Sequence, residues 1–171
     1  MRVNYWYIKP MIKTVIRKLE VNDWQLYKSL RISALQDSPE AFGSSYELEI
    51  SYKENKWKTR LKDSTIFVAF SDDAPVGLVG SFTKPERPTE RMLFSMWVDP
   101  DYRDQKIGDQ LVRHFISWSK SQKATKIIAG ISDENIGVFN FYEKLGFKKT
   151  GEKVALMRNS DACEIIISLN L

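Results

Sequence analysis

The sequence predicts a single mixed α/β domain, and three observations carry that prediction. Short apolar segments with strand-like alternation recur along the chain, and segments with helical apolar spacing are interleaved with them. The 171 residues are enough for one hydrophobic core of useful size. The chain contains no internal repeat and no low-complexity linker, so residues 14–171 are expected to fold as one unit after a flexible extension of residues 1–13.

The first half of the domain has the pattern of a strand, two helices and three strands. Residues 14–20 alternate as a strand does, and a helix is expected over residues 22–36 because Asn22 or Asp23 can cap it. A second helix is expected over residues 45–61. The three strands that follow are expected over residues 66–70, 75–82 and 91–98.

The second half continues with a helix, a strand, a shorter helix and two strands. Apolar residues at i, i+4, i+8 and i+11 from Ile107 predict an amphipathic helix over residues 105–121. A shorter helix is expected over residues 135–145, with Gly146 closing it as a C-cap. The three expected strands cover residues 126–131, 148–157 and 163–169.

Charge and composition exclude several function classes. The formal net charge of +4 comes entirely from residues 1–20, while residues 21–171 are neutral, so nucleic acid is not an expected partner. One cysteine and one histidine cannot form a Cys/His zinc site, and no metal is expected. No apolar run reaches the roughly 20 residues that span a membrane. Without a signal peptide or a possible internal disulfide, the expected location is the cytoplasm.

The segment from Val98 to Gly108 carries the clearest chemical signal. An apolar strand runs through Pro100 into a turn, and an amphipathic helix starts within a few residues. The first turn of a helix has unpaired N–H groups and the positive end of the helix dipole, which suit a phosphate or pyrophosphate. Arg103 adds a cation there, and Gly108 lets a ligand approach closely. The nucleotide motifs GxxxxGK[ST] and GxGxxG are absent.

These residues and a second motif resemble the GCN5-related N-acetyltransferase (GNAT) family. Its acetyl-CoA signature is [Arg/Gln]-x-x-Gly-x-[Gly/Ala] after a strand ending Val-x-Pro. The matching residues are Val98, Pro100, Arg103, Lys106 and Gly108, followed by Leu111. The second match begins at Asn135 and ends with the phrase FYEKLGF, from Phe141 to Phe147. The resemblance implies the GNAT fold, a central twisted mixed sheet of about seven strands with four helices.

Two loop residues depart from the family, which most often has glycine at their positions. Asp104 and Lys106 would preserve the backbone path if both had right-handed helical angles. Lys106 could also reach a phosphate, whereas an inward-pointing Asp104 would repel one. The expected affinity for acetyl-CoA therefore depends on the conformation of this loop.

The resemblance implies direct transfer of an acetyl group from acetyl-CoA to an amine, with no acyl-enzyme. The pantetheine arm would pair with the backbone of Met96, Trp97 and Val98 like an added strand. A backbone N–H near Val98 would stabilise the oxyanion. The pyrophosphate would lie on the loop and helix start. That set comprises Arg103, Asp104, Gln105, Lys106, Ile107, Gly108 and Asp109.

The second motif implies two further site residues. Tyr142 matches the family tyrosine that gives a proton to the departing thiolate, a role open to a phenol with a pKa of about 10 against about 8.5 for a thiol. Packing in the core is the plainer interpretation of a tyrosine on an apolar helix face. Asn135 would hydrogen-bond the cofactor or cap its own helix, and the sequence leaves both open.

The acceptor side is less specified. A carboxylate acting through water is the expected base, with Glu90 and Glu47 as candidates. Residues 20–54 are acidic and residues 103–126 are basic, which would suit a cationic amine and a polyphosphate unless both are ordinary solvated faces. The expected partner is a small-molecule or peptide amine. Dimers are common in the family that the chain resembles, and the sequence leaves a homodimer open. The alternative is a catalytically silent module that keeps the fold and binds CoA.

Overall fold

The computed structural model describes residues 14–156 and 159–171, so the extension expected over residues 1–13 lies outside the described residues. Seven strands occur in the described ranges. They are β1 (Thr14–Lys18), β2 (Thr65–Ser71), β3 (Ala74–Phe82), β4 (Glu90–Val98), β5 (Lys126–Ser132), β6 (Lys148–Leu156) and β7 (Asn159–Asn170). The α-helices of the same ranges are α1 (Trp24–Asp37), α2 (Tyr46–Ile50), α3 (Glu54–Asp63), α4 (Ile107–Ser121) and α5 (Phe139–Lys144).

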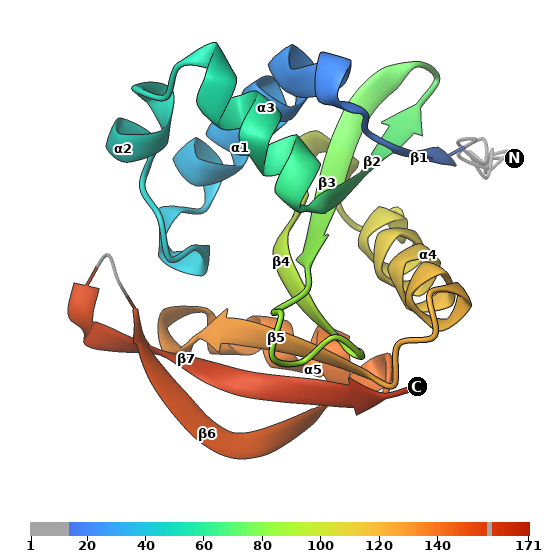
Figure 1. Cartoon of the computed structure of the whole chain (residues 1–171). Coiled ribbons are helices and arrows are strands. Elements are labelled where there is room, and N and C mark those ends of the chain that lie inside the picture. The colour runs from blue at the N-terminus through green and yellow to red at the C-terminus, as the bar shows by residue number, and fades with distance from the viewer. Residues whose placement is uncertain (1–13, 157–158) are drawn as a thin grey trace, which may run out of the picture.

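The strands form one mixed sheet in the order β1-β2-β3-β4-β5-β7-β6. Strands β4 and β5 pair in parallel, and the other described neighbours pair antiparallel. Helix α4 forms the crossover that a parallel pair requires. In Figure 1, β1–β4 and α1–α3 make up the upper part of the molecule, and β5–β7 make up the lower part. The predicted seven-stranded mixed sheet is confirmed.

The single helix expected over residues 45–61 is wrong, because α2 and α3 are separate helices. The hydroxyl of Ser45 caps α2 by accepting from the N–H of Leu48 at 3.3 Å. The hydroxyl of Ser51 donates to the carbonyl of Leu48 at 2.6 Å, just beyond the end of α2. Lys53 then has extended angles, with φ −77° and ψ 162°. Local serine bonds to the backbone thus compete with a continuous helix.

Two other helix boundaries differ from expectation. Helix α4 begins two residues late, at Ile107, because Lys106 has left-handed angles. The helix expected over residues 135–145 is a 3-10 turn (Asp133–Val138) followed by the short α5, with Gly146 beyond its end as expected. The described residues therefore hold five α-helices where four were expected. None of these described helices has both the length and the apolar character needed to cross a membrane.

Two hydrophobic clusters cover the two faces of the sheet. Alternate residues of β2 contribute to both, because successive side chains of a strand point to opposite faces. Phe67 and Ala69 join the cluster under α4 and α5, whereas Ile66 and Val68 join the cluster under α1 and α3. Trp97 of β4 is buried in the second cluster. The sheet is thus fixed from both sides around β4.

A buried ion cluster joins the three helices of the second face. The fully buried carboxylate of Glu49 accepts from Nη2 of Arg31 on α1 at 2.9 Å and from Nη1 of Arg60 on α3 at 2.6 Å. Burial alone would raise the pKa of Glu49, but the hydrogen bonds and charges of both guanidinium groups lower it to about 2. The Arg31 guanidinium also stacks on Phe42, 4.6 Å from the ring centroid. The cluster therefore holds the segment that follows α1.

Candidate functional site

The parallel strands β4 and β5 separate part-way along their length. Their pairing covers residues 90–93 and 126–129 and ends there. On the other edge of β4, the register against β3 shifts between Leu78 and Gly80, and Ser95 has φ +53°. Such a bulge bends the strand. The remainder of β4 therefore continues without β5 beside it.

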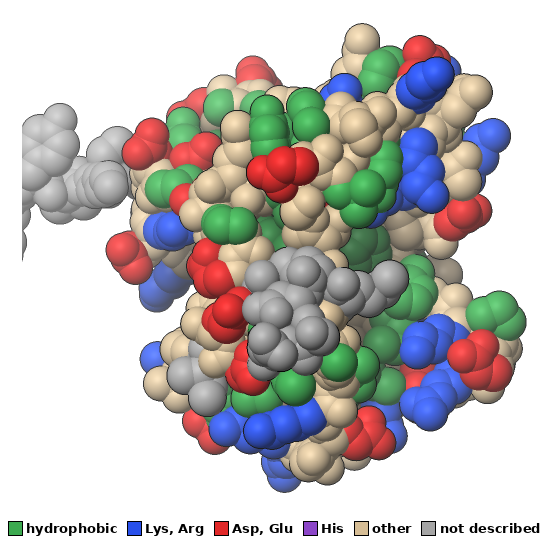
Figure 2. Space-filling model, turned by 90° about the vertical axis from the view of Figure 1, so that its left-hand side faces the viewer, with side chains coloured by type: hydrophobic (Ala, Val, Ile, Leu, Met, Phe, Trp, Pro, Cys, Tyr) green, Lys and Arg blue, Asp and Glu red, His purple; other side chains and the backbone are tan. Residues whose placement is uncertain are grey.

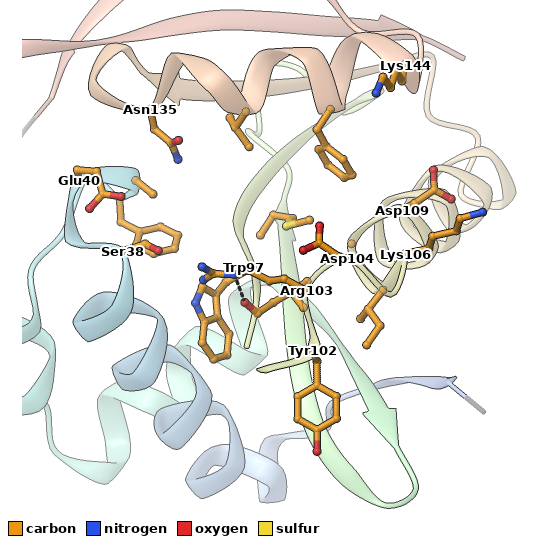
Figure 3. A pocket seen from close by; sticks show the side chains of 18 residues that line it. Ser38, Glu40, Trp97, Tyr102, Arg103, Asp104, Lys106, Asp109, Asn135 and Lys144 are labelled. Atoms are coloured by element: carbon orange, nitrogen blue, oxygen red, sulfur yellow. Dashed lines mark hydrogen bonds between the residues drawn. The ribbon is translucent and has the colours of Figure 1, made fainter. Parts of the chain in front are cut away.

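A cavity of about 710 Å³ opens at this divergence (Figure 3). Its walls come from the end of β4, the start of α4, the turn before α5 and the segment after α1. Of the residues expected at the cofactor, those that line it are Met96, Trp97, Val98, Arg103, Asp104, Lys106, Ile107, Gly108, Asp109 and Asn135. Gln105 instead donates its amide to the carbonyl of Asp101 at 3.3 Å. No group of three or more His, Cys, Asp or Glu suited to a metal occurs among the described residues.

The start of α4 forms one wall of the cavity. Its first intrahelical hydrogen bond runs from the N–H of Gln110 to the carbonyl of Lys106 at 3.0 Å. Helix geometry therefore leaves the N–H groups of residues 107–109 without intrahelical partners. At Gly108 a methyl group would lie 2.7 Å from Cε of Met96, so the helix start and β4 approach each other closely. This wall presents the positive end of the helix dipole.

The loop before α4 turns through two left-handed residues. Asp104 has φ +60° and Lys106 has φ +61°. The sequence analysis expected these two residues to preserve the backbone path of the loop through right-handed angles, and that expectation is wrong. Left-handed angles cost a residue with a Cβ about 1–2 kcal/mol, whereas glycine adopts them freely. The loop thus has a glycine-type path at both positions without a glycine.

The guanidinium of Arg103 is bonded to protein groups, and not directed to an open phosphate site as expected. Its Nε donates to the carbonyl of Val98 at 3.0 Å, and its Nη2 pairs with the carboxylate of Asp37. That carboxylate also accepts from the indole of Trp97 at 2.8 Å and the hydroxyl of Ser38 at 2.7 Å. Burial would raise the pKa of Asp37, but these bonds lower it. Asp37 therefore ties the loop to β4 and α1.

Asn135 lies on the wall of the cavity opposite β4. Its side chain extends toward the space between the walls, where Ser38 and Glu40 approach from the other side (Figure 3). Asn135 has φ −118° and interrupts the 3-10 turn, and the residue at the N-cap of α5 is Val138. Of its two expected roles, capping α5 is therefore wrong. The side chain remains on the cavity wall.

Tyr142 lies behind the cavity wall and does not line it. Only 6% of the residue is exposed, and its ring packs between Phe141 and Phe147 at centroid distances of 5.0 and 5.3 Å. It shares a hydrophobic cluster with Val98 and Ile107, both of which line the cavity. Burial raises the pKa of its hydroxyl well above the ordinary value. The phenol is therefore held in its protonated form.

A sequence profile of the acetyltransferase (GNAT) family matches residues 28–147. The match includes both motifs and runs from α1 to the residue after Gly146. The chain belongs to the GNAT family. The resemblance drawn from Val98–Gly108 and Phe141–Phe147 is confirmed.

Individual GNAT relatives agree with this assignment. Over 93 residues the chain is 33% identical to human N-acetyltransferase 8B, covering 52% of this chain and 40% of that protein. Over 92 residues it is 32% identical to peptidyl-lysine N-acetyltransferase YjaB of Salmonella typhimurium, covering 53% and 55%. The matched part thus spans about half the length of these relatives. The CoA complex of PaiA N-acetyltransferase from Thermoplasma acidophilum shares the fold, with TM-score 0.72, 21% identity and coverage of 94% and 100%.

The structure does not bring the two expected bases of this GNAT domain to the cavity. Glu90 lies at the far end of β4, pairs with Arg87 at 3.3 Å and lines a separate groove beside Lys126. Glu47 is exposed on the first turn of α2. The buried acid of that helix is Glu49, whose carboxylate is already bonded to two arginines. Neither expected carboxylate is placed to act at the divergence of β4 and β5.

Sequence reasoning missed several residues that line the cavity. Ser38, Glu40 and Phe42 come from the segment after α1, and Lys144 comes from the end of α5. The sequence indicated only that residues 38–42 lie between the two helices expected over residues 22–36 and 45–61. Its position beside the turn before α5 is a long-range contact that no local pattern encodes. The acidic excess of residues 20–54 was the one available signal.

Glycine at either left-handed position should stabilise the domain. We expect Asp104→Gly and Lys106→Gly each to raise the free energy of unfolding by about 0.5–1 kcal/mol, because relief of the left-handed strain exceeds the added entropy of the unfolded chain. Urea unfolding without ligand measures this effect. Asp101→Gly is the matched control, since Asp101 lies in the 3-10 turn Pro100–Tyr102 and its substitution should destabilise. Equal losses at all three positions would contradict the argument.

Removing the Asp37 carboxylate should loosen the loop of residues 103–106 before α4. Asp37→Ala would leave the buried indole N–H of Trp97 without its acceptor and release Arg103 from α1. We expect a loss of about 1–3 kcal/mol in the free energy of unfolding. The dissociation constant for acetyl-CoA should rise several-fold, measured by calorimetry. Asp63→Ala, at the exposed end of α3, is the control. Identical binding in both variants would show that the loop does not depend on Asp37.

Proposed function

We propose that this chain transfers an acetyl group from acetyl-CoA directly to a primary amine in a ternary complex. The observation that carries the proposal is the divergence of β4 and β5 onto the start of α4. It combines a free edge of extended backbone, a helix N-terminus and a protonated phenol behind the same wall. These three features suit a pantetheine arm, a pyrophosphate and a departing thiolate. Membership of the GNAT family supports acetyl transfer.

The residues present fit CoA. The backbone of Met96, Trp97 and Val98 would pair with the pantetheine arm, because the β5 ladder ends before these residues. The N–H groups of the loop and helix start, residues 103–109, would hold the pyrophosphate. The left-handed angles of Asp104 and Lys106 favour this role, because the loop keeps the backbone path that glycine residues would give it. Asn135 would hydrogen-bond the arm from the opposite wall.

The proposed chemistry uses two groups of this chain on the thioester. The amine nitrogen attacks the carbonyl carbon, and an N–H of the segment Met96–Val98 stabilises the oxyanion. Collapse breaks the C–S bond, and Tyr142 gives its phenolic proton to the sulfur. Burial raises the pKa of Tyr142, so the phenol keeps its proton until the thiolate forms. No group of the chain is acetylated on the way.

The proposed acceptor is an amine on a small molecule or a peptide. A relative from Salmonella typhimurium is named a peptidyl-lysine N-acetyltransferase, which supports a primary amine. The acidic excess of residues 20–54 supports a cationic acceptor, since residues 38–42, between α1 and α2, include four that line the cavity. A homodimer and a cytoplasmic location belong to the same proposal, and light scattering of the purified chain tests the first.

Acetyl-CoA-dependent release of free thiol tests the function. The full chain is assayed with polyamines, amino acids, aminoglycosides, peptide N-termini and lysine peptides, and CoA binding is measured by calorimetry. Turnover with at least one amine supports the enzyme. CoA binding without turnover on any amine would favour the silent module, which the Asp104 and Lys106 departures suggested. Neither binding nor turnover would overturn both functions.

A further inference from the structure

A carboxylate that the sequence did not single out lies beside the divergence of β4 and β5. Glu164 of β7 is the ladder partner of Ser132, and its side chain lies over Gly130 of β5. A methyl group at position 130 would lie 2.7 Å from Cδ of Glu164. Gly130 is also the first residue of β5 after the pairing with β4 has ended at Ala129. The carboxylate therefore lies over β5 just beyond the point where β5 leaves β4, next to the cavity but outside the residues that line it.

Glu164 approaches the gap between β4 and β5 from the face opposite Tyr142. Along β5, Ala129 and Ile131 point into the hydrophobic cluster under α4 and α5 that contains Tyr142. Side chains alternate along a strand, so position 130 faces the other side. The segment after α1 lies on that side, where a methyl group at Gly43 would lie 3.8 Å from Oε1 of Glu164. Phenol and carboxylate thus flank the gap from opposite faces.

The surroundings of Glu164 leave its carboxylate available. The side chain is half-buried and, in the part of the chain that the structure describes, accepts no hydrogen bond and forms no ion pair. Burial raises the pKa of this carboxyl above its ordinary value. Glu49 and Asp37, by contrast, are held by two and three side-chain donors. A half-buried carboxylate without donors is suited to binding an ammonium group.

Apolar side chains surround the same face of the sheet. Phe82 packs on Phe94 at a centroid distance of 5.7 Å, and Val154, the ladder partner of Glu164, is 52% exposed. Figure 2 shows a hollow between the part with α1–α3 and the β6–β7 hairpin, with hydrophobic side chains inside it and charged ones around it. A carboxylate beside an apolar surface fits an amine carried on an alkyl stem, as in a lysine side chain.

We propose that Glu164 binds the ammonium group of the acceptor and takes its proton before attack, an inference that rests on the proposed acetyl transfer. The carboxylate gains the proton of the N–H bond, and the freed lone pair forms the C–N bond to the acetyl carbon. The C–S bond breaks on the other side of the gap, where Tyr142 protonates the sulfur. The nitrogen loses its second proton to water as the C–S bond breaks, which leaves a neutral amide. The carboxylate has then gained one proton and the phenol has lost one, and exchange with water restores both. The acceptor class is an alkyl primary amine of lysine type.

Glu164→Gln tests this role, because it removes the charge and keeps the shape. The probe is a lysine peptide with a blocked α-amine, and the expected result is a fall in kcat/KM of about 100-fold. The dissociation constant for acetyl-CoA should stay within about two-fold, because its proposed contacts lie on the other face. The fall in kcat/KM caused by Glu164→Gln should be far smaller for a peptide with a hydrazide in place of the lysine amine, because a hydrazide is neutral at pH 7. Glu152→Gln, exposed on the neighbouring β6, is the matched control.

Gly130→Ala provides an independent variant, since its methyl group must displace the Glu164 carboxylate. It should lower kcat/KM for the lysine peptide without weakening acetyl-CoA binding. If Glu164→Gln had the wild-type kcat/KM, or lost as much kcat/KM with the hydrazide peptide as with the lysine peptide, the role of Glu164 would be overturned. The proposed acetyl transfer would not be affected. A loss in Glu90→Gln and none in Glu164→Gln would give the role to Glu90. A wild-type chain that acetylates no amine would overturn the proposed function and this assignment together.

Discussion

Glu49→Ala should be the most destabilising of the substitutions considered, with a loss of about 3–5 kcal/mol in the free energy of unfolding. The variant leaves Arg31, which is 5% exposed, charged and without its carboxylate, and its Nη1 already has no hydrogen-bond partner among the described residues. Arg60 loses the same partner. Thermal unfolding should shift down by about 10 °C for a domain of this size. Circular dichroism during heating and urea titration measures both effects.

Glu47→Ala is the matched control for this prediction. Glu47 lies on the same short helix but is exposed, so its loss should change the free energy of unfolding by no more than about 0.5 kcal/mol. A Glu49→Ala protein as stable as Glu47→Ala would show that the ion cluster does not hold α2. Glu49→Gln, which keeps the side-chain volume, separates the loss of charge from the loss of packing.

The same cluster gives the domain a pH-dependent stability. The pKa of Glu49 is lowered from 4.5 to about 2 in the folded state, so the unfolded chain binds the proton more tightly. The stabilising contribution is therefore complete above the unfolded value and is lost as pH falls through the folded one. We expect the difference in unfolding free energy between wild type and Glu49→Gln to shrink between about pH 5 and pH 2. A difference that stays constant over this range would contradict the assigned pKa.

The features that sequence reasoning predicted correctly depend on local patterns. The apolar spacing from Ile107 located α4, and the phrase ending at Phe147 located the family motif that follows β5. Both signals lie within one element and its flanking turn. Strand β4 and the start of α4, which form one side of the cavity, are also close to each other in the sequence. Local pattern was therefore sufficient for the order of the strands and for placing α4 directly after β4, but not for the conformation of the loop between them.

The features that sequence reasoning missed depend on contacts between distant segments. Arg103 was assigned to phosphate because the pattern around it does not show that Asp37 lies within reach. Glu164 was not considered because only the register of β7 on β5 places it over Gly130. The left-handed angles of Asp104 and Lys106 were missed for another reason, since residues other than glycine adopt such angles infrequently. Contacts between distant segments thus determine the partner of Arg103 and the position of Glu164.

Tyr142→Phe should lower kcat for acetyl transfer by about 100-fold, the loss typical of a missing general acid. The ring packing between Phe141 and Phe147 is retained, because only the hydroxyl is removed from the buried side chain. Tyr142 lies behind the cavity wall, so the dissociation constant for CoA should change by no more than about two-fold. Single-turnover kinetics with a saturating amine measure the first quantity, and calorimetry measures the second.

Tyr52→Phe is the matched control for the loss of a phenol, since Tyr52 packs on Trp57 beside α3 and away from the cavity. Its kcat should equal that of the wild type. If kcat of Tyr142→Phe were also unchanged, Tyr142 would be a core residue only, and the thiolate would leave without its help. A fall in kcat matched by an equal fall in CoA affinity would indicate a damaged cavity wall. A fall in kcat with unchanged CoA affinity would identify Tyr142 as the proton donor, because the ring packing of Tyr142→Phe is that of the wild type.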